Sequence, residues 1–202
     1  MENGFTTDTL REGFGRMIAK LEACAGELNA LDAVLGDGDL GVTMARGAKS
    51  VQAELKNLPD DVGMALLKCA QAFTKISGST LGTLLATGLM SAAKAAKGRL
   101  EVPWKEVSSL LAGARDSMSS RSQGQLGDKT ILDALEAARV AVNGLEDPVA
   151  MVSAANEAVA LALERFRNQT SRQGRARIFG DKSIGQDDPG MVAFKRILES
   201  LL

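Results

Sequence analysis

Apolar residues recur at steps of three and four along almost all of the 202-residue chain, and this helical period excludes most other folds. The first apolar stripe runs between Thr7 and Val34, and the last follows the pair Asp188-Pro189. The junctions between stripes carry helix-start residues, as in Asp147-Pro148, where Asp caps a helix and Pro suits its first turn. No run typical of a strand is longer than a few residues. The sequence therefore predicts an all-α fold.

The stripes also predict how the chain is organised. We expect eight helices in an antiparallel bundle or barrel. With 45% hydrophobic residues the chain can fill one core but is short for two, so residues 1–202 are predicted to form a single domain. The predicted helices cover approximately residues 7–34, 42–55, 60–73, 77–97, 103–118, 128–144, 147–168 and 188–201.

Charge and composition exclude several kinds of partner. A formal net charge of −1 and an aromatic content of 3% provide neither a basic surface nor stacking platforms, so we expect no nucleic acid partner. The chain has no basic start followed by an apolar run, and no stretch approaches the roughly 18 apolar residues of a membrane span. We expect a cytoplasmic protein without a membrane segment.

Histidine and tyrosine are both absent from the sequence. Their absence removes Ser-His-Asp and Cys-His nucleophile pairs, histidine-ligated zinc and imidazole acid–base catalysis. Cys24 and Cys69 stand apart in alanine-rich helical segments and are predicted to be buried thiols. Chemistry must therefore rest on carboxylates, cations and backbone groups, a set that suits phosphoryl transfer.

An acidic loop is the first candidate site. Asp32, Asp37 and Asp39 lie within eight residues of sequence, and no Lys or Arg follows before Arg46. Carboxylate oxygens are the ligands that Mg²⁺ and Ca²⁺ prefer, and the glycines in this loop allow the backbone to bring the three side chains together. The loop is predicted to be a metal site, and the alternative is a solvated turn whose aspartates cap the next helix.

Two known loop patterns are excluded for this segment. Residues 36–41 match the G-x-G-x-x-G pattern of dinucleotide-binding folds, but a helix precedes them instead of a strand, and two aspartates would repel phosphate unless a metal intervened. An EF-hand fails because no Glu stands at its twelfth position, where Thr43 or Ala48 is found. The conflict between aspartates and phosphate favours a metal-bridged phosphate.

Polar patterns recur nearer the C-terminus. Residues 127–131, Gly-Asp-Lys-Thr-Ile, are echoed by residues 180–184, Gly-Asp-Lys-Ser-Ile. These loops either face one ligand or are ordinary turns, for which Gly, Asp, Ser and Thr are favoured. Five arginines, at positions 165, 167, 172, 175 and 177, precede the second loop. They suit an anionic ligand such as a phosphoryl group, and a solvated surface loop is the alternative.

Together these motifs resemble the nucleotide-binding (ADP-binding, L-type) subunit of the dihydroxyacetone kinase family. The residues that carry the resemblance are 31–39 (Leu-Asp-Ala-Val-Leu-Gly-Asp-Gly-Asp), 127–130, 174–176, 180–185 and 188–190. They stand in the family's order and spacing over nearly the whole chain. The resemblance implies an eight-helix antiparallel barrel, and a kinase of glycerol metabolism that transfers a phosphoryl group from Mg-ATP to a small keto-sugar.

The resemblance also implies roles for individual residues. Asp32, Asp37 and Asp39 correspond to the aspartates that hold two Mg²⁺ ions, which bridge the phosphates of ADP or ATP. Arg175 corresponds to a phosphate-facing arginine with a catalytic role. The implied nucleotide contacts are Leu40, Gly41, Val42, Thr43, Thr80, Leu81, Ser122, Ile131, Arg175, Asp188, Pro189 and Gly190.

The resemblance implies partners as well. In this family a separate subunit or domain holds the ketone substrate through its own histidine, which fits a chain that has no histidine. The phosphoryl donor is either ATP or a bound ADP that a phosphotransferase-system protein recharges. The acceptor, dihydroxyacetone or another short sugar such as erythrulose, stays open, and so does a homodimeric state.

The sequence departs from the family pattern at three places. The usual His after the acidic loop is Leu40, a usual Gly is Ser122, and the phosphate turn Gly-Ala-Ser-Gly reads Ser-Thr-Leu-Gly at residues 79–82. Leu81 offers no hydroxyl to a phosphate, although backbone amides there can still donate. Two alternatives follow: a non-catalytic regulatory or binding module of the same fold, and the nucleotide domain of a fatty acid kinase with a lipid carrier as partner.

Overall fold

The structure is a computed structural model that describes residues 3–75 and 79–202. Helices dominate these residues, which confirms the all-α prediction. The helices within them are α1 Thr7–Ala23, α2 Ala25–Leu35, α3 Leu40–Glu54, α4 Val62–Thr74, α5 Thr80–Ala96, α6 Val107–Ser122, α7 Ile131–Ala141, α8 Pro148–Arg167 and α9 Pro189–Glu199. Short 3-10 helices are η1 Leu55–Asn57, η2 Trp104–Glu106 and η3 Ala176–Ser183.

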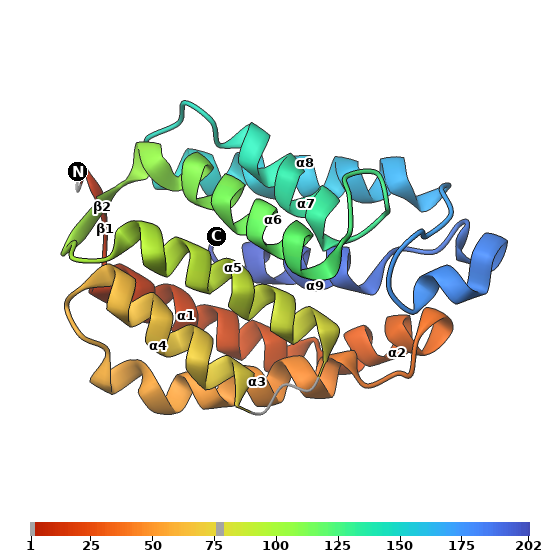
Figure 1. Cartoon of the computed structure of the whole chain (residues 1–202), viewed down its shortest axis with the longest axis horizontal. Helices are drawn as coiled ribbons and strands as arrows, with labels where there is room; N and C mark the ends of the chain where they lie inside the picture. Colours follow the sequence, from red (N-terminus) through yellow and green to blue (C-terminus); the bar gives the residue numbers. More distant parts are fainter. Residues whose placement is uncertain (1–2, 76–78) are drawn as a thin grey trace.

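The helices form a ring around one core (Figure 1). From α3 to α9 each helix packs against the next one along the chain, α1 packs against α3, and α9 returns against α1. Short connections make consecutive helices antiparallel, as in helical bundles. The interior is filled by side chains such as Leu21, Met44 and Val159, all of which are fully buried. Among the described residues no helix is both long enough and apolar enough to cross a bilayer.

Charged side chains close the ring between its first and last helices. Arg196 of α9 donates from Nε to Glu27 of α2 at 2.9 Å and from Nη1 to Glu199 at 2.7 Å. Lys20 of α1 lies 3.1 Å from the same Glu199 carboxylate. Burial raises the pKa of Glu199, but hydrogen bonds from Lys195, Arg196 and Lys20 outweigh this effect and hold the pKa at about 2. Ion pairs as well as apolar packing therefore hold α9 against α1 and α2.

The predicted first helix is wrong in one respect, because it divides at Cys24. This residue ends α1 with φ −96° and ψ 6°, and its N–H donates to the Lys20 carbonyl at 3.0 Å. Gly26, which has a weak helix propensity, stands two residues further on and favours a break there. The described residues therefore contain nine α-helices instead of the expected eight. Cys24 and Cys69 are both buried free thiols, as predicted.

Two predicted helix starts also shift, and a third lies outside the described residues. The predicted N-cap Asp128 is wrong, because Thr130 caps α7: its hydroxyl accepts from Leu132 N at 3.2 Å and its own N–H donates to Asp133 at 2.9 Å. The helix expected from residue 103 begins at Val107, since β2 Glu101–Pro103 pairs antiparallel with β1 Gly4–Thr6. The start expected at residue 77 lies outside the described residues, and α5 begins at Thr80.

Candidate functional site

The acidic loop between α2 and α3 brings three carboxylates together. One ligand oxygen from each of Asp32, Asp37 and Asp39 lies within 4.8 Å of the other two. Asp32 is half-buried in the last turns of α2, whereas Asp37 and Asp39 are exposed. Three carboxylate oxygens at this spacing could together hold a hard divalent cation.

Asp32 also shapes the backbone of this loop. Its Oδ2 accepts hydrogen bonds from the N–H groups of Gly38 at 3.0 Å, Asp39 at 3.1 Å and Leu40 at 3.3 Å. These donors stand at the start of α3, where backbone N–H groups have no partner within the helix. Asp32 therefore stabilises the start of α3, and the same carboxylate belongs to the candidate cation site.

Two glycines make the turn into α3 possible. Gly38 has a φ of 76°, a conformation that residues with a side chain rarely adopt. At Gly41 a Cβ would overlap the carbonyl oxygen of Ala25, so the first turn of α3 lies directly against the start of α2. Val42 N–H then donates to the Asn29 side chain at 3.1 Å, which fixes the direction of the helix.

Arg175 reaches the acidic loop from the C-terminal part of the chain. It directly precedes η3, and its guanidinium forms an ion pair with Asp37. Both side chains are largely exposed, Arg175 at 65% and Asp37 at 47%. An anion or a cation arriving from solvent can therefore reach either member of the pair.

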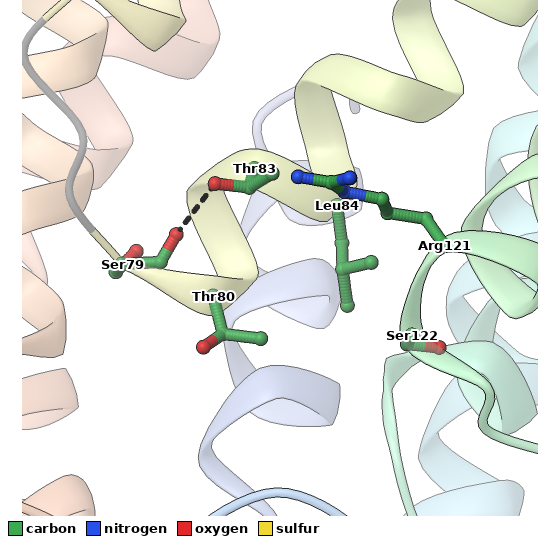
Figure 2. A pocket seen from close by; sticks show the side chains of 6 residues that line it. All are labelled: Ser79, Thr80, Thr83, Leu84, Arg121 and Ser122. Atoms are coloured by element: carbon green, nitrogen blue, oxygen red, sulfur yellow. Dashed lines mark hydrogen bonds between the residues drawn. The ribbon is translucent and has the colours of Figure 1, made fainter.

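An open pocket of about 300 Å³ lies between the start of α5 and the end of α6 (Figure 2). Ser79 caps α5 by accepting from Gly82 N at 3.0 Å. In Figure 2 the Arg121 side chain extends from α6 toward Thr83. A helix N-terminus beside an arginine favours an anionic group. The residues that line the pocket are Ser79, Thr80, Thr83, Leu84, Arg121 and Ser122.

The first turns of α5, α7 and α9 meet at Gly190. A Cβ built on Gly190 of α9 would lie 3.6 Å from Leu81 Cδ1 of α5 and 3.7 Å from Ile131 Cβ of α7. The glycine leaves the space between these side chains open. Leu81, Ile131 and Gly190, for which the family resemblance implies nucleotide contacts, are thus brought together.

Asp188 caps α9 in the same region. Its Oδ1 accepts from Met191 N at 2.8 Å, as expected for an Asp-Pro helix start. Desolvation raises the pKa of this carboxyl to about 6, and Lys129 opposes part of the effect. Pro189 is buried behind it. Asp188 is therefore a carboxyl group that titrates near neutral pH.

The remaining predicted residues fall in the first turn of α3. Leu40 and Gly41 are buried, Thr43 is half-buried and Val42 is exposed. The Leu40 side chain belongs to the core, so this residue offers the loop its N–H, which Asp32 accepts. The acidic loop, the start of α5, residues 123–130 and the segment before α9 all lie toward the right-hand end of the ring in Figure 1.

Two residues of this region were missed by sequence reasoning. Arg121 reads as the last charged residue of a surface helix, and only its position in the pocket distinguishes it. Lys129 is only 1% exposed, although a lysine in a polar loop is ordinarily solvated. The signal that could have found Lys129 is the repeated Gly-Asp-Lys pattern in which it stands.

Comparison with known proteins places this helical ring, with its acidic loop, in one family. The DAK2 domain model matches residues 34–202, and the chain belongs to this family. Its sequence is 31% identical over 180 residues to the PEP-dependent dihydroxyacetone kinase, ADP-binding subunit DhaL, of Escherichia coli, with 86% of this chain and 85% of that protein covered.

Larger proteins match as well. The chain is 30% identical over 211 residues to Triokinase/FMN cyclase of Mus musculus, covering 98% of this chain but only 35% of that protein. The dihydroxyacetone kinase from C. freundii, solved in complex with AMP-PNP and Mg²⁺, has the same fold, with a TM-score of 0.78 at 23% identity. The match covers 98% of this chain and 34% of that one. The chain thus spans about a third of these larger relatives.

Proposed function

We propose that this chain is the nucleotide-binding subunit of a dihydroxyacetone-type kinase, which transfers a phosphoryl group from a Mg-nucleotide to a small keto-sugar. The observation that carries the proposal is the contact of Arg175 with the cluster of Asp32, Asp37 and Asp39. A cation site and an arginine are the electrostatic parts that phosphoryl transfer requires. The kinase names of the relatives support the same class of reaction.

The three aspartates would hold Mg²⁺, and we propose two ions. Their oxygens are hard donors within 4.8 Å of one another, which fits the carboxylate ligands that Mg²⁺ takes beside water and phosphate oxygens. Bound Mg²⁺ neutralises charge on the phosphates of a nucleotide. The carboxylates themselves orient the ions, and Asp32 keeps the loop backbone in place through its three hydrogen bonds.

We propose that the nucleotide lies across the helix starts at this end of the ring. Backbone N–H groups at the first turns of helices donate to phosphates without any side-chain hydroxyl, so Leu81 is compatible with the role. Arg175 is the proposed catalytic residue. Its guanidinium would leave Asp37 and contact the phosphoryl oxygens of the nucleotide. The remaining proposed contacts are Leu40, Gly41, Val42, Thr43, Thr80, Ser122, Ile131, Asp188, Pro189 and Gly190.

The chain would act with other proteins. We propose a separate substrate-binding subunit for the keto-sugar and, because the Escherichia coli relative is PEP-dependent by name, a phosphotransferase-system protein that recharges bound ADP. ATP as direct donor is the other form of the proposal. We further propose that residues 1–202 act as one domain in the cytoplasm.

The experiment that tests the function is calorimetric titration of ADP and ATP into the purified chain, with and without Mg²⁺. Tight binding that requires Mg²⁺ is expected, and nucleotide released by denaturing the purified protein would favour the recharged-ADP form. Absence of binding in every condition would refute the kinase role and favour the regulatory module. Phosphoryl transfer only in the presence of a lipid-loaded partner would favour the fatty acid kinase alternative.

A further inference from the structure

The buried lysine in the loop before α7 holds a distant segment of the chain. The Lys129 ammonium donates to the carbonyl oxygens of Gln169 and Ser183, each at 2.8 Å, and of Arg167 at 3.1 Å. An ammonium has three N–H donors, so three carbonyls satisfy it. All three acceptors belong to the part of the chain that runs from the end of α8 to the end of η3.

A buried cation is costly unless its surroundings compensate for the lost water. Desolvation lowers the pKa of Lys129, whereas Asp188 and Asp187 oppose this shift. The Arg167 carbonyl adds to the compensation, because it stands at the C-terminus of α8, where the helix dipole favours positive charge. Lys129 also has a φ of 61°, a backbone conformation that glycine adopts more easily. The turn alone does not explain why a buried, charged side chain stands at position 129.

The same loops contact the segment just ahead of Arg175. Arg172 N–H donates to the Asp128 carbonyl at 3.0 Å, and Gln173 Nε2 donates to the Ser122 carbonyl at 2.7 Å. Arg175 follows within three residues and pairs with Asp37. The short segment of residues 172–175 therefore contacts residues near Lys129 at one end and the acidic loop at the other.

We propose that Lys129 is a positioning residue, whose ammonium gathers residues 167–183 against the helix ring and thereby places Arg175 beside the acidic loop. The inference rests on the proposed function for its catalytic consequence, because Arg175 is the group to be placed. The echoed motif supplies a matched control. Lys182 occupies the equivalent position in the second Gly-Asp-Lys pattern, and its side chain is exposed.

The first experiment compares amide hydrogen exchange in the full-length wild type, Lys129→Met and Lys182→Met. The reporters are the N–H groups of Ser171 and Gly185, which donate to Ser183 Oγ and the Arg167 carbonyl, each at 2.8 Å. Lys129→Met is expected to speed their exchange about tenfold or more while the amides of α4 stay protected. Lys182→Met should match the wild type. Unchanged protection in Lys129→Met would overturn the proposal.

A second variant covers the case in which Lys129→Met does not fold, as judged by helical circular dichroism. Lys129→Gln keeps two N–H donors on a side chain one atom shorter, and it removes the charge and one donor. It is expected to speed exchange of the same amides about threefold or more, again with α4 unchanged. Wild-type exchange in a folded Lys129→Gln would overturn the proposal in the same way.

The second experiment measures turnover in the complex with the substrate subunit, with dihydroxyacetone and Mg-ATP as probes. Misplacing a transition-state group lowers kcat more than it weakens binding, so Lys129→Met should lose about tenfold or more in kcat with KM for Mg-ATP within about threefold. Wild-type kcat despite a loosened segment would overturn the positioning role. If the wild type binds no Mg-nucleotide, the proposed function fails, whereas the exchange result still tests the contacts of Lys129.

Discussion

Arg175 and Asp37 form an ion pair that joins the acidic loop to the segment before α9. Both side chains of the pair are exposed to solvent, and an exposed ion pair contributes only about 0–1 kcal/mol to the stability of the fold. A divalent cation that needs the Asp37 carboxylate can therefore displace the guanidinium at little cost. The displaced Arg175 would then be available to an anion that arrives with the cation.

Replacing this arginine should strengthen cation binding when no nucleotide is present. Arg175→Gln removes the competitor for Asp37, and a pair worth up to about 1 kcal/mol corresponds to an affinity gain of up to about fivefold. Titration of Mn²⁺ followed by electron paramagnetic resonance measures the affinity directly. Arg172→Gln removes one positive charge from the same segment and is expected to have a smaller effect. Equal or weaker Mn²⁺ binding in Arg175→Gln would contradict the competition.

Removal of one carboxylate from the acidic loop should abolish Mg²⁺-dependent nucleotide binding. Asp37→Ala deletes a proposed ligand but no backbone hydrogen bond that shapes the loop, so the helical circular dichroism should stay intact. The measurement is the same ADP titration with and without Mg²⁺. Asp8→Ala, which removes an exposed carboxylate from α1, should bind as the wild type does. Retained Mg²⁺ dependence in Asp37→Ala would exclude the metal assignment.

The pKa of Asp188 predicts a pH dependence of stability. Its carboxyl keeps a proton up to about pH 6 in the folded chain, compared with an ordinary pKa of 3.8. Between these values this carboxyl binds more protons in the folded state than in the unfolded state, so its contribution to the free energy of unfolding falls as the pH rises from about 4 to about 6 and then levels off. The decline amounts to at most about 3 kcal/mol.

Asp188→Asn should remove this decline, because an amide caps α9 without titrating. Urea denaturation at several pH values, without divalent cations, gives the free energies to compare. Asp147→Asn is the matched control, since Asp147 caps α8 from an exposed position by accepting from Ala150 N at 2.8 Å. The control should keep the decline. An Asp188→Asn profile parallel to the wild type would show that another group is responsible.

The close contact at Gly41 predicts a strong effect of one methyl group. In Gly41→Ala the new Cβ would overlap the Ala25 carbonyl, and overpacking of this kind costs about 1–3 kcal/mol. Gly15→Ala adds the same methyl group to α1 in open space and should be neutral or stabilising by up to about 1 kcal/mol. Urea denaturation measures both changes. Equal stabilities of the two variants would mean that α3 can move away from α2 freely.

Much of the fold could be predicted because its signals are local in sequence. Helical period gave the helices, and the Asp-Pro starts at Asp147 and Asp188 are confirmed by side chains that accept from the N–H three residues on. The convergence of three carboxylates followed from short spacing and flexible glycines. The break at Cys24 was not predicted, because the apolar stripe continues across it without a change of period and a single glycine, Gly26, does not by itself end a helix.

Other parts depend on contacts between distant residues. A lysine in a polar loop is ordinarily solvated, and only the carbonyls brought by the C-terminal segment make the burial of Lys129 tolerable. Arg121 lines the pocket only because α6 ends beside the start of α5. The pairing of Arg175 with Asp37 likewise requires the ring to be closed. The local sequence around Lys129, Arg121 or Arg175 therefore does not predict which distant residues each of them contacts.

The closure of the ring by α9 has a consequence during synthesis. The acidic loop leaves the ribosome well before Asp188 and Gly190, which we propose to contact the nucleotide. Contacts between such distant parts of a chain form late, because a long loop must close first. A nascent or C-terminally truncated chain therefore exposes aspartates without their arginine or the final helix start. The proposed site can therefore assemble only after the start of α9 has been synthesised.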